Sequence, residues 1–144
     1  MSSALTDPNL GKTLDGRYRL DHLLALGGMS RIYRSMDKRL HRAVVVKILN
    51  DNYASEPTIR ERFQSEAVIA ANITHPNVVS IRDHNVSDNL VYLVMEYVRG
   101  RNLDQVISER GRFTPRQTLS VLEQICNGLS AAHREGIIHR DMKP

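Results

Sequence analysis

Residues 43–49 read Ala43-Val44-Val45-Val46-Lys47-Ile48-Leu49, and this stretch decides the fold. Its aliphatic, largely β-branched side chains predict a β-strand. Because side chains alternate along a strand, Lys47 shares a face with Val45 and Leu49. An ammonium group on a buried strand face needs an anionic partner. The alternative is an edge strand on which Lys47 points to solvent and discourages aggregation.

The chain before this strand is expected to form a hairpin. Tyr18, Leu20 and Leu24 alternate with polar residues, which predicts a half-buried strand. Residues 32–36 form a second strand, and residues 38–41 turn the chain into the strand that carries Lys47.

The segment 25–32 lies between these two strands and reads Ala-Leu-Gly-Gly-Met-Ser-Arg-Ile. Small residues at Gly27 and Gly28 let backbone N–H groups come close to a polyphosphate. A simple hairpin with a Gly-Gly turn explains the same residues, since paired glycines are common in hairpins.

A helix is expected after the lysine strand, with Ser55 as N-cap and Pro57 in its first turn. Its apolar stripe consists of Ile59, Phe63, Ala67 and Ala70. Glu66 falls on this stripe, where a carboxylate must be paired or protonated unless it reaches water at the stripe's edge. An ion pair between Lys47 and Glu66 would satisfy both charges and hold the ammonium ready for a phosphate.

The remaining chain predicts two more strands and then helices. The strands cover residues 78–81 and 90–98, with a turn over 87–89. A short helix over 103–110 follows, closed by Gly111. Five strands with one inserted helix, followed by helices, indicate an α+β layout.

The last helix is expected to begin at a capping box over residues 114–117, with Pro115 at its first position. Its apolar stripe consists of Leu119, Leu122, Ile125, Leu129 and Ala132. Gly136 stands where a left-handed C-terminal cap is expected.

The composition is that of an ordinary globular protein: of the 144 residues, 41% are hydrophobic and 25% are charged. This length suits one domain or a piece of a larger one. No apolar run approaches the roughly 20 residues of a membrane helix, and the first residues lack the features of a signal peptide. The single cysteine, Cys126, excludes an internal disulfide and any multi-cysteine zinc site. We therefore expect a reducing, cytoplasmic setting, with residues 1–15 as a flexible lead-in.

The net charge of +4 includes one denser basic stretch. Its members are Arg31, Arg34, Lys38, Arg39 and Arg42. A basic patch can hold phosphate groups, including those of nucleic acid. No aromatic residues interleave with these charges and no nucleic-acid-binding motif is present, which favours a solvated surface and no nucleic-acid partner.

The chain ends in His139-Arg140-Asp141-Met142-Lys143-Pro144. Asp141 could accept a proton from a hydroxyl nucleophile, and Lys143 could steady a transferred phosphoryl group. Taken alone, the same residues fit a polar loop after a helix.

Together these motifs resemble a eukaryotic-type protein serine/threonine kinase of the kind found in actinobacteria and related bacteria. Residues 44–47 match the Val-Ala-Ile-Lys strand, Glu66 falls in the helix that follows, and residues 139–141 match the His-Arg-Asp start of the catalytic loop. Stretches 75–79, 94–98 and 133–138 are also similar to kinase sequences. The resemblance covers about residues 16–144.

The resemblance implies a kinase fold that is only partly present. Residues 16–98 correspond to a complete N-lobe and hinge, made of a five-stranded antiparallel sheet plus the αC helix. Residues 99–144 correspond to the first helices of the C-lobe, truncated within the catalytic loop.

The family also implies a role for each matched position. The positions implied to contact ATP are Leu24, Gly27, Gly28, Ser30, Ile32, Lys47, Met95, Glu96 and Val98. Among them Lys47 binds the α- and β-phosphates, held by Glu66, and Met95 is the gatekeeper behind the adenine. Asp141 is implied to be the catalytic base, and Lys143 to contact the γ-phosphate. The Asp-x-Lys-Pro form is similar to serine/threonine rather than tyrosine kinases.

The sequence departs from the family pattern in two places. Ala25 and Ser30 replace the first and third glycines of Gly-x-Gly-x-x-Gly. The catalytic-loop Asn would stand five residues after Asp141, at position 146, and the Asp-Phe-Gly and Ala-Pro-Glu motifs are absent too. Mg²⁺ is therefore expected in the full-length enzyme, whereas its protein ligands are absent here.

We expect the chain to be the N-terminal portion of a kinase that transfers phosphoryl groups from ATP to Ser and Thr hydroxyls of proteins. Because the metal site is missing, we expect the chain alone to be inactive, and its exposed helix stripe to make it sticky. The alternative is a non-catalytic nucleotide-binding or interaction module derived from a truncated kinase, which could form a homodimer through that helix. Bacterial relatives often carry a membrane helix after a cytoplasmic kinase domain, so the resemblance also leaves a membrane-anchored full-length protein open.

Overall fold

The computed structural model describes residues 7–140 and 142–144. The chain divides into two units. The first holds the described residues up to Val68 together with Ile81–Tyr97, and the second holds Ile69–Ser80 together with Val98–Pro144. Residues 1–6 of the expected lead-in, and the expected catalytic base Asp141, lie outside the described residues.

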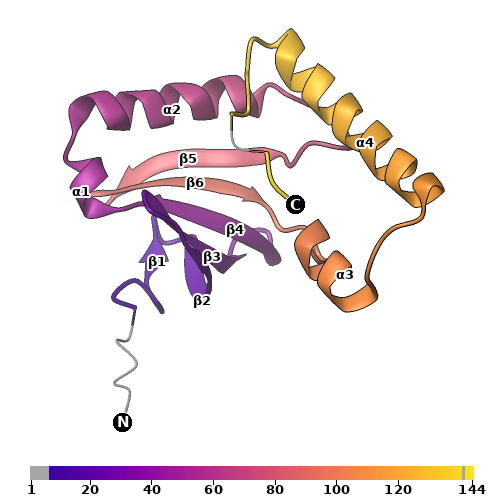
Figure 1. Ribbon diagram of the computed structural model, residues 1–144. Coiled ribbons are helices and arrows are strands. Elements are labelled where there is room, and N and C mark those ends of the chain that lie inside the picture. The colour runs from indigo at the N-terminus through magenta and orange to yellow at the C-terminus, as the bar shows by residue number, and fades with distance from the viewer. Residues whose placement is uncertain (1–6, 141) are drawn as a thin grey trace. The chain divides into compact units, whose positions relative to one another are not determined.

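One curled antiparallel sheet makes up most of the first unit (Figure 1). Its strand order is β1-β2-β3-β4-β6-β5. The strands are β1 Thr13–Leu14, β2 Tyr18–Leu26, β3 Ser30–Asp37, β4 Arg42–Leu49, β5 Ile81–Ser87 and β6 Leu90–Glu96. The sequence predicted five strands; the additional β1 has only two residues, which is too short to show an alternating pattern.

Two helices are inserted between β4 and β5: α1 Asp51–Ala54 and α2 Pro57–Ala71. The structure confirms Pro57 in the first turn of α2. It also confirms the apolar stripe, in which Ala67 is buried and the other three members are half-buried. The four-residue helix α1 was not expected, because one turn is too short to show a helical period.

The hairpin of β5 and β6 turns at Asp88 and Asn89, whose φ angles are 49° and 63°. Two consecutive positive φ values are typical of a type I′ turn, which confirms the turn expected here. The strand predicted over 78–81 is wrong, since β5 begins at Ile81. Residues 75–78 instead form a turn in which the Val78 N–H donates to the His75 carbonyl at 3.1 Å.

The core of the first unit lies on one face of the sheet. Alternate residues of β4 point into it, and they pack with three tyrosines from β2, β3 and β6. These residues, none more than 2% exposed, are Val44, Val46, Ile48, Tyr18, Tyr33 and Tyr92. The rings of Tyr18 and Tyr92 meet edge to face with centroids 6.1 Å apart, a favourable aromatic geometry.

Each of these tyrosine hydroxyls donates a hydrogen bond to an aspartate. The pairs are Tyr18 with Asp83 at 2.7 Å, Tyr33 with Asp7 at 2.9 Å, and Tyr92 with Asp15. The pKa values of Tyr18 and Tyr92 are raised above the usual value for tyrosine. Burial is the larger cause, and the hydrogen-bonded aspartate is the second. Two of the three acceptors come from the segment before β2, so these polar residues complete the core.

The segment from Asp7 to Asp15 is therefore packed on the sheet, which corrects the expectation of a flexible lead-in for this part of the chain. Leu14 is 1% exposed and Asn9 is 8% exposed. Asp7 also pairs with Arg31 at 3.0 Å. The polar composition of this segment suggested disorder. The sequence does not show that Asp7 and Asp15 accept hydrogen bonds from buried tyrosine hydroxyls far along the chain.

Asp37 fixes the turn between β3 and β4 to the start of β2. Its carboxylate accepts two hydrogen bonds from Arg17, at 3.0 and 2.7 Å, and two more from the backbone of Arg39 and Leu40. The Arg17 hydrogen bonds, with help from the backbone N–H groups, lower the pKa of Asp37 to about 2. Asp37 is 1% exposed, so this charge is held inside the fold.

The second unit contains α3 Leu103–Arg110 and α4 Pro115–Arg134. Thr114 and Gln117 form the predicted capping box, with hydrogen bonds of 3.2 and 2.9 Å between each side chain and the other's backbone N–H. Asn102 and Gln105 form a second capping box at α3 that was not expected. Gly136 has a φ of 76°, which confirms the left-handed residue expected after α4.

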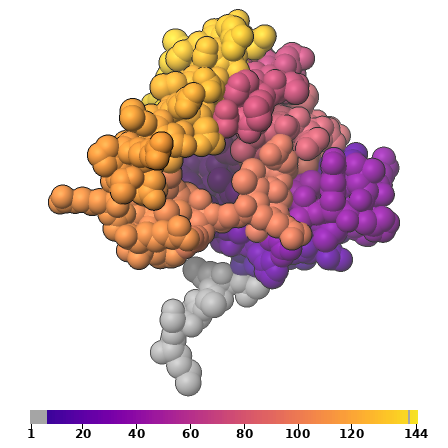
Figure 2. Space-filling model, turned by 90° about the vertical axis from the view of Figure 1, so that its right-hand side faces the viewer, coloured from indigo at the N-terminus to yellow at the C-terminus, as the bar shows by residue number. Residues whose placement is uncertain are grey.

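The apolar stripe of α4 is only partly covered. Leu119 is 68% exposed and Leu122 is 48% exposed, whereas Ile125, Leu129 and Ala132 are half-buried. In Figure 2 α4 lies within the orange-to-yellow part of the surface. Among the described residues, no helix combines the length and apolar character needed to span a membrane.

Candidate nucleotide-binding site

Lys47 stands in the middle of the sheet face opposite the core. In the register of the sheet, Ile32 of β3 and Leu93 of β6 are its direct neighbours. Val45, two residues earlier on the same face, lies opposite Met95. The side chain of Lys47 is half-buried in this row. The sheet therefore brings Ile32, Lys47 and Met95, all expected to contact ATP, onto one face.

Leu24 occupies an irregular position of β2, where the pairing register shifts between Leu23 and Ala25. Bulged residues of this kind bend a strand and redirect a side chain. Leu24 is 50% exposed. An exposed leucine at the edge of this face is suited to contact a flat apolar ligand group.

The loop between β2 and β3 is a tight turn. The Gly27 N–H donates to the Ser30 carbonyl at 2.8 Å. A Cβ at Gly27 would stand 3.1 Å from that same carbonyl oxygen, which is a tight contact. Ser30 is only 8% exposed, whereas Gly28 has open space around it.

Asn50 is attached to this loop by two hydrogen bonds. Its backbone N–H donates to the Met29 carbonyl at 2.8 Å. Its side-chain Nδ2 donates to the Gly28 carbonyl at 3.2 Å. Asn50 was not predicted from the sequence, because nothing in its neighbourhood signals a contact 22 residues away.

Glu66 does not pair with Lys47, which corrects the predicted ion pair. Its side chain is 73% exposed and lies 3.6 Å from Arg62, one turn earlier on α2. Ala67 is the one buried residue of α2 among those described. The helical period gave the correct apolar stripe, but the surface next to Glu66 is left open to water rather than covered by the sheet.

The end of β6 carries the residues expected to bind the adenine. Met95 and Glu96 are half-buried, and Glu96 lies 3.7 Å from Arg82 across the hairpin. The Arg34 guanidinium stacks over the Tyr97 ring at 5.4 Å. Arg34 had been assigned to a solvated basic stretch, yet it lies on the same sheet face as Ile32.

The remaining expected site residues belong to the second unit. Val98 is 58% exposed and directly follows the first unit. Lys143 is exposed. Arg140 has a φ of 65°, a left-handed conformation that is uncommon for a residue other than glycine and often marks functional loops.

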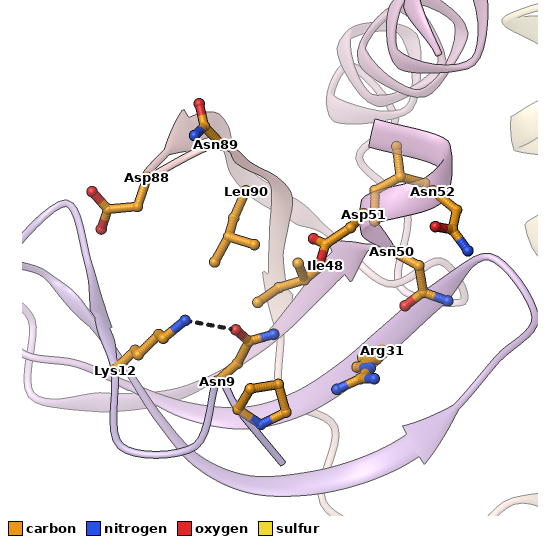
Figure 3. Close-up of a pocket in the computed structure, with 12 residues that line it drawn as sticks. Asn9, Lys12, Arg31, Ile48, Asn50, Asp51, Asn52, Asp88, Asn89 and Leu90 are labelled. Atoms are coloured by element: carbon orange, nitrogen blue, oxygen red, sulfur yellow. Dashed lines mark hydrogen bonds between the residues drawn. The ribbon is translucent and has the colours of Figure 1, made fainter. Parts of the chain in front are cut away.

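A separate pocket of about 570 Å³ opens on the other face of the sheet (Figure 3). Buried Ile48, Leu49 and Leu90 line it together with polar side chains. Lys12 points into it and donates to Asn9 Oδ1 at 3.1 Å. None of the residues expected to contact ATP lines this pocket. Arg31 and Ile48 line it, and they are the sequence neighbours of Ile32 and Lys47 on the opposite face.

Comparison with known proteins decides the family. Residues 18–144 match the family model described as the protein kinase domain. The chain belongs to the protein kinase family. This confirms the predicted resemblance and the kinase-like fold, with an N-lobe sheet and the first helices of the C-lobe.

The kinase chain is 42% identical over 142 residues to the serine/threonine-protein kinase PknA of Mycobacterium tuberculosis, covering 95% of this chain and 33% of PknA. It is 40% identical over 135 residues to the serine/threonine-protein kinase PrkC of Bacillus subtilis, covering 94% of this chain and 21% of PrkC. The crystal structure of the PknI kinase domain of M. tuberculosis superposes with a TM-score of 0.77 at 27% identity, over 93% of this chain and 55% of that one. The chain thus spans a third or less of these two curated relatives.

Proposed function

We propose that this chain supplies the ATP-binding part of a protein serine/threonine kinase, which moves the γ-phosphoryl group of ATP to Ser or Thr hydroxyls of proteins. The observation that carries the proposal is the position of Lys47. Lys47 is a half-buried residue on one sheet face with Ile32 and Met95. Within the described residues no carboxylate forms an ion pair with it. A half-buried, unneutralised cation favours the binding of an anion such as a phosphate.

The apolar neighbours of Lys47 suit the adenine. Leu24 and Ile32 would contact one side of the ring, and Met95 would close the back of its pocket. The backbone of Glu96 and Val98 would hydrogen-bond the ring edge, as kinases of this family do. The loop residues Gly27, Gly28 and Ser30 would cover the phosphates with their backbone N–H groups.

The catalytic roles are proposals carried over from the family motif. Asp141 would accept the proton of the attacking hydroxyl, and Lys143 would contact the γ-phosphate. Glu66 is also carried over from the family motif as a site residue, although it lies beside Arg62 and does not pair with Lys47.

Magnesium is expected with ATP, but the residues present do not make a site for it. Within residues 7–140 and 142–144, no group of three or more His, Cys, Asp or Glu side chains is arranged to hold a metal ion. We also propose that the chain alone does not transfer phosphate. The proposed partners are ATP and proteins that carry Ser or Thr, and the proposed location of this domain is the cytoplasm. A membrane anchor in the full-length protein stays a prediction from the resemblance.

The test is a titration of MgATP into the purified chain, its Lys47→Met variant and its Lys38→Met variant. Lys38 is exposed in the β3–β4 turn and serves as the matched control. Because charge-assisted hydrogen bonds contribute about 1.5–3 kcal/mol, we expect Lys47→Met to weaken binding at least about tenfold. Lys38→Met should bind like the wild type. Equal binding by Lys47→Met and wild type would contradict the proposal.

The same preparations test the expected inactivity of the chain. No radiolabel should pass from ATP to a generic basic protein above the level seen with Lys47→Met. Time-dependent labelling that disappears in Asp141→Asn would show that the chain is active by itself.

A further inference from the structure

The turn between β2 and β3 is held from the end of β4 by one residue. Asn50 directly follows Leu49 and is the N-cap residue of α1. It makes two of the hydrogen bonds of the turn, through its backbone N–H to Met29 and through its side chain to Gly28. The tip of the loop is therefore attached three residues after Lys47, directly beyond the end of β4.

The side chain of Asn50 does not cap α1, although Asn50 occupies the N-cap position of that helix. Asparagine is a preferred N-cap residue because its side-chain oxygen accepts an N–H of the first helical turn. At α1 there is no side-chain cap hydrogen bond. The amide instead reaches across to the loop, so removing it does not remove a helix cap.

The two bonds orient the peptide groups of the loop. In a trans peptide the carbonyl and the N–H of one plane point in opposite directions, and the described chain contains no cis peptide. Because the Gly28 and Met29 carbonyls point to Asn50, the N–H groups of Met29 and Ser30 in the same planes point away from it. Backbone N–H groups presented by a glycine loop are the donors that bind phosphate oxygens.

We infer that Asn50 is a positioning residue for nucleotide binding: it fixes the Gly27–Ser30 loop so that the loop's N–H donors face the phosphates. The inference rests on the proposed ATP binding, and it adds a residue that itself lies on the other face of the sheet. There Asn50 lines the pocket of Figure 3 together with Arg31. Arg31 follows the loop directly and is tied to Asp7 at 3.0 Å.

The experiment compares the wild type with Asn50→Ala, Asn50→Asp and Asn52→Ala. Asn50→Ala removes the side-chain bond and leaves the backbone bond to Met29. Asn50→Asp keeps the size but replaces the donor with an acceptor that faces the Gly28 carbonyl. Asn52→Ala changes an exposed asparagine in α1 that makes no side-chain hydrogen bond to the loop, and serves as the control.

The first readout is hydrogen exchange of the peptide that covers Gly27–Arg31, measured without nucleotide. We expect exchange to be about three- to tenfold faster in both Asn50 variants than in the wild type and in Asn52→Ala, the range of one lost hydrogen bond. Exchange in β4 and β6 should be unchanged, which excludes general unfolding. Unchanged exchange in the loop would overturn the inference.

The second readout is the dissociation constant of MgATP. Both Asn50 variants should bind about three- to tenfold more weakly, with Asn50→Asp the weaker of the two because its charge also repels phosphate. Wild-type affinity in Asn50→Ala would overturn the role in nucleotide binding. If the loop exchanges faster but no variant, the wild type included, binds ATP, the loop attachment stands while both the proposed function and the phosphate role fail.

Discussion

The charged side chains of this chain differ in burial and in the number of hydrogen bonds that they make. Asp37 is enclosed and accepts four hydrogen bonds, whereas Glu66 points to water beside Arg62. An exposed ion pair contributes at most about 1 kcal/mol. Removing one partner of a buried ion pair destabilises the fold more strongly, because the other charge is left buried without a counter-charge.

The pKa of Asp37 gives the first prediction, for Asp37→Asn. A carboxyl whose pKa is lowered from 3.8 to about 2 on folding stabilises the fold at pH values above 3.8, and this contribution is lost as the pH falls toward 2. Asp37→Asn should therefore lower the free energy of unfolding by about 2 kcal/mol at pH 7. The difference from wild type should shrink between pH 4 and pH 2 in urea titrations.

Asp21→Asn is the control for this prediction. Asp21 pairs with the half-exposed Arg19 at 2.6 Å, so its loss should cost less than about 1 kcal/mol. A constant difference between wild type and Asp37→Asn over the whole pH range would contradict the account.

At the scale of residues, the sequence predicted which face of an element a side chain lies on better than it predicted which residue that side chain contacts. Strand alternation correctly placed Lys47 on the face of Val45. The partner of Glu66 was predicted wrongly, because a helical period identifies a face but not what covers it. The contacts of Asn50 with Gly28 and of Arg34 with Tyr97 were missed, since they depend on the register between strands.

At the scale of elements, features that depend on neighbouring residues were predicted from the sequence, whereas features that depend on tertiary packing were not. The Thr114 capping box and Gly136 were predicted from the sequence because capping depends on residues a few positions apart. The packed segment 7–15 was not, because the tyrosines that Asp7 and Asp15 bind, Tyr33 and Tyr92, lie far along the chain. The strand β1 was missed because it has only two residues. Residues 82–87 of β5 were not predicted to be a strand, because their mostly polar side chains show no apolar alternation.

Gly128 of α4 provides the prediction at the scale of elements. An exposed helical glycine replaced by alanine usually gains about 1 kcal/mol. Gly128 is buried, however, and a Cβ there would stand 2.7 Å from the Asn77 carbonyl oxygen of the 69–80 segment. The steric clash with backbone outweighs helix propensity, so Gly128→Ala should destabilise the second unit by about 1–3 kcal/mol.

Thermal unfolding followed by circular dichroism measures this effect. Ser130→Ala, at an exposed position on the same helix, should leave the melting temperature within a few degrees of wild type. A rise in melting temperature for Gly128→Ala would mean that α4 does not pack on Asn77.

At the scale of the whole molecule, we expect the uncovered part of α4 to promote self-association. Leu119 and Leu122 are neighbours one turn apart, and both are substantially exposed. Each leucine buried against another surface contributes about 1.5–3 kcal/mol, so two of them favour self-association at high concentration. Leu119→Gln combined with Leu122→Gln should raise the dissociation constant of any oligomer at least about tenfold.

Sedimentation velocity over a range of concentrations tests this prediction. Ser120→Gln, a polar change at a neighbouring exposed position, should behave like the wild type. Monomeric behaviour of the wild-type chain at high concentration would contradict the prediction.

The central claim is that a nucleotide binds on the sheet face that carries Lys47, and not in the pocket on the opposite face. Hydrogen exchange with and without saturating MgATP distinguishes the two faces. The account predicts slower exchange in residues 24–32, 43–49 and 94–98, with no change in residues 8–12 and 86–91. Protection confined to residues 8–12 and 86–91, or no protection anywhere, would contradict it.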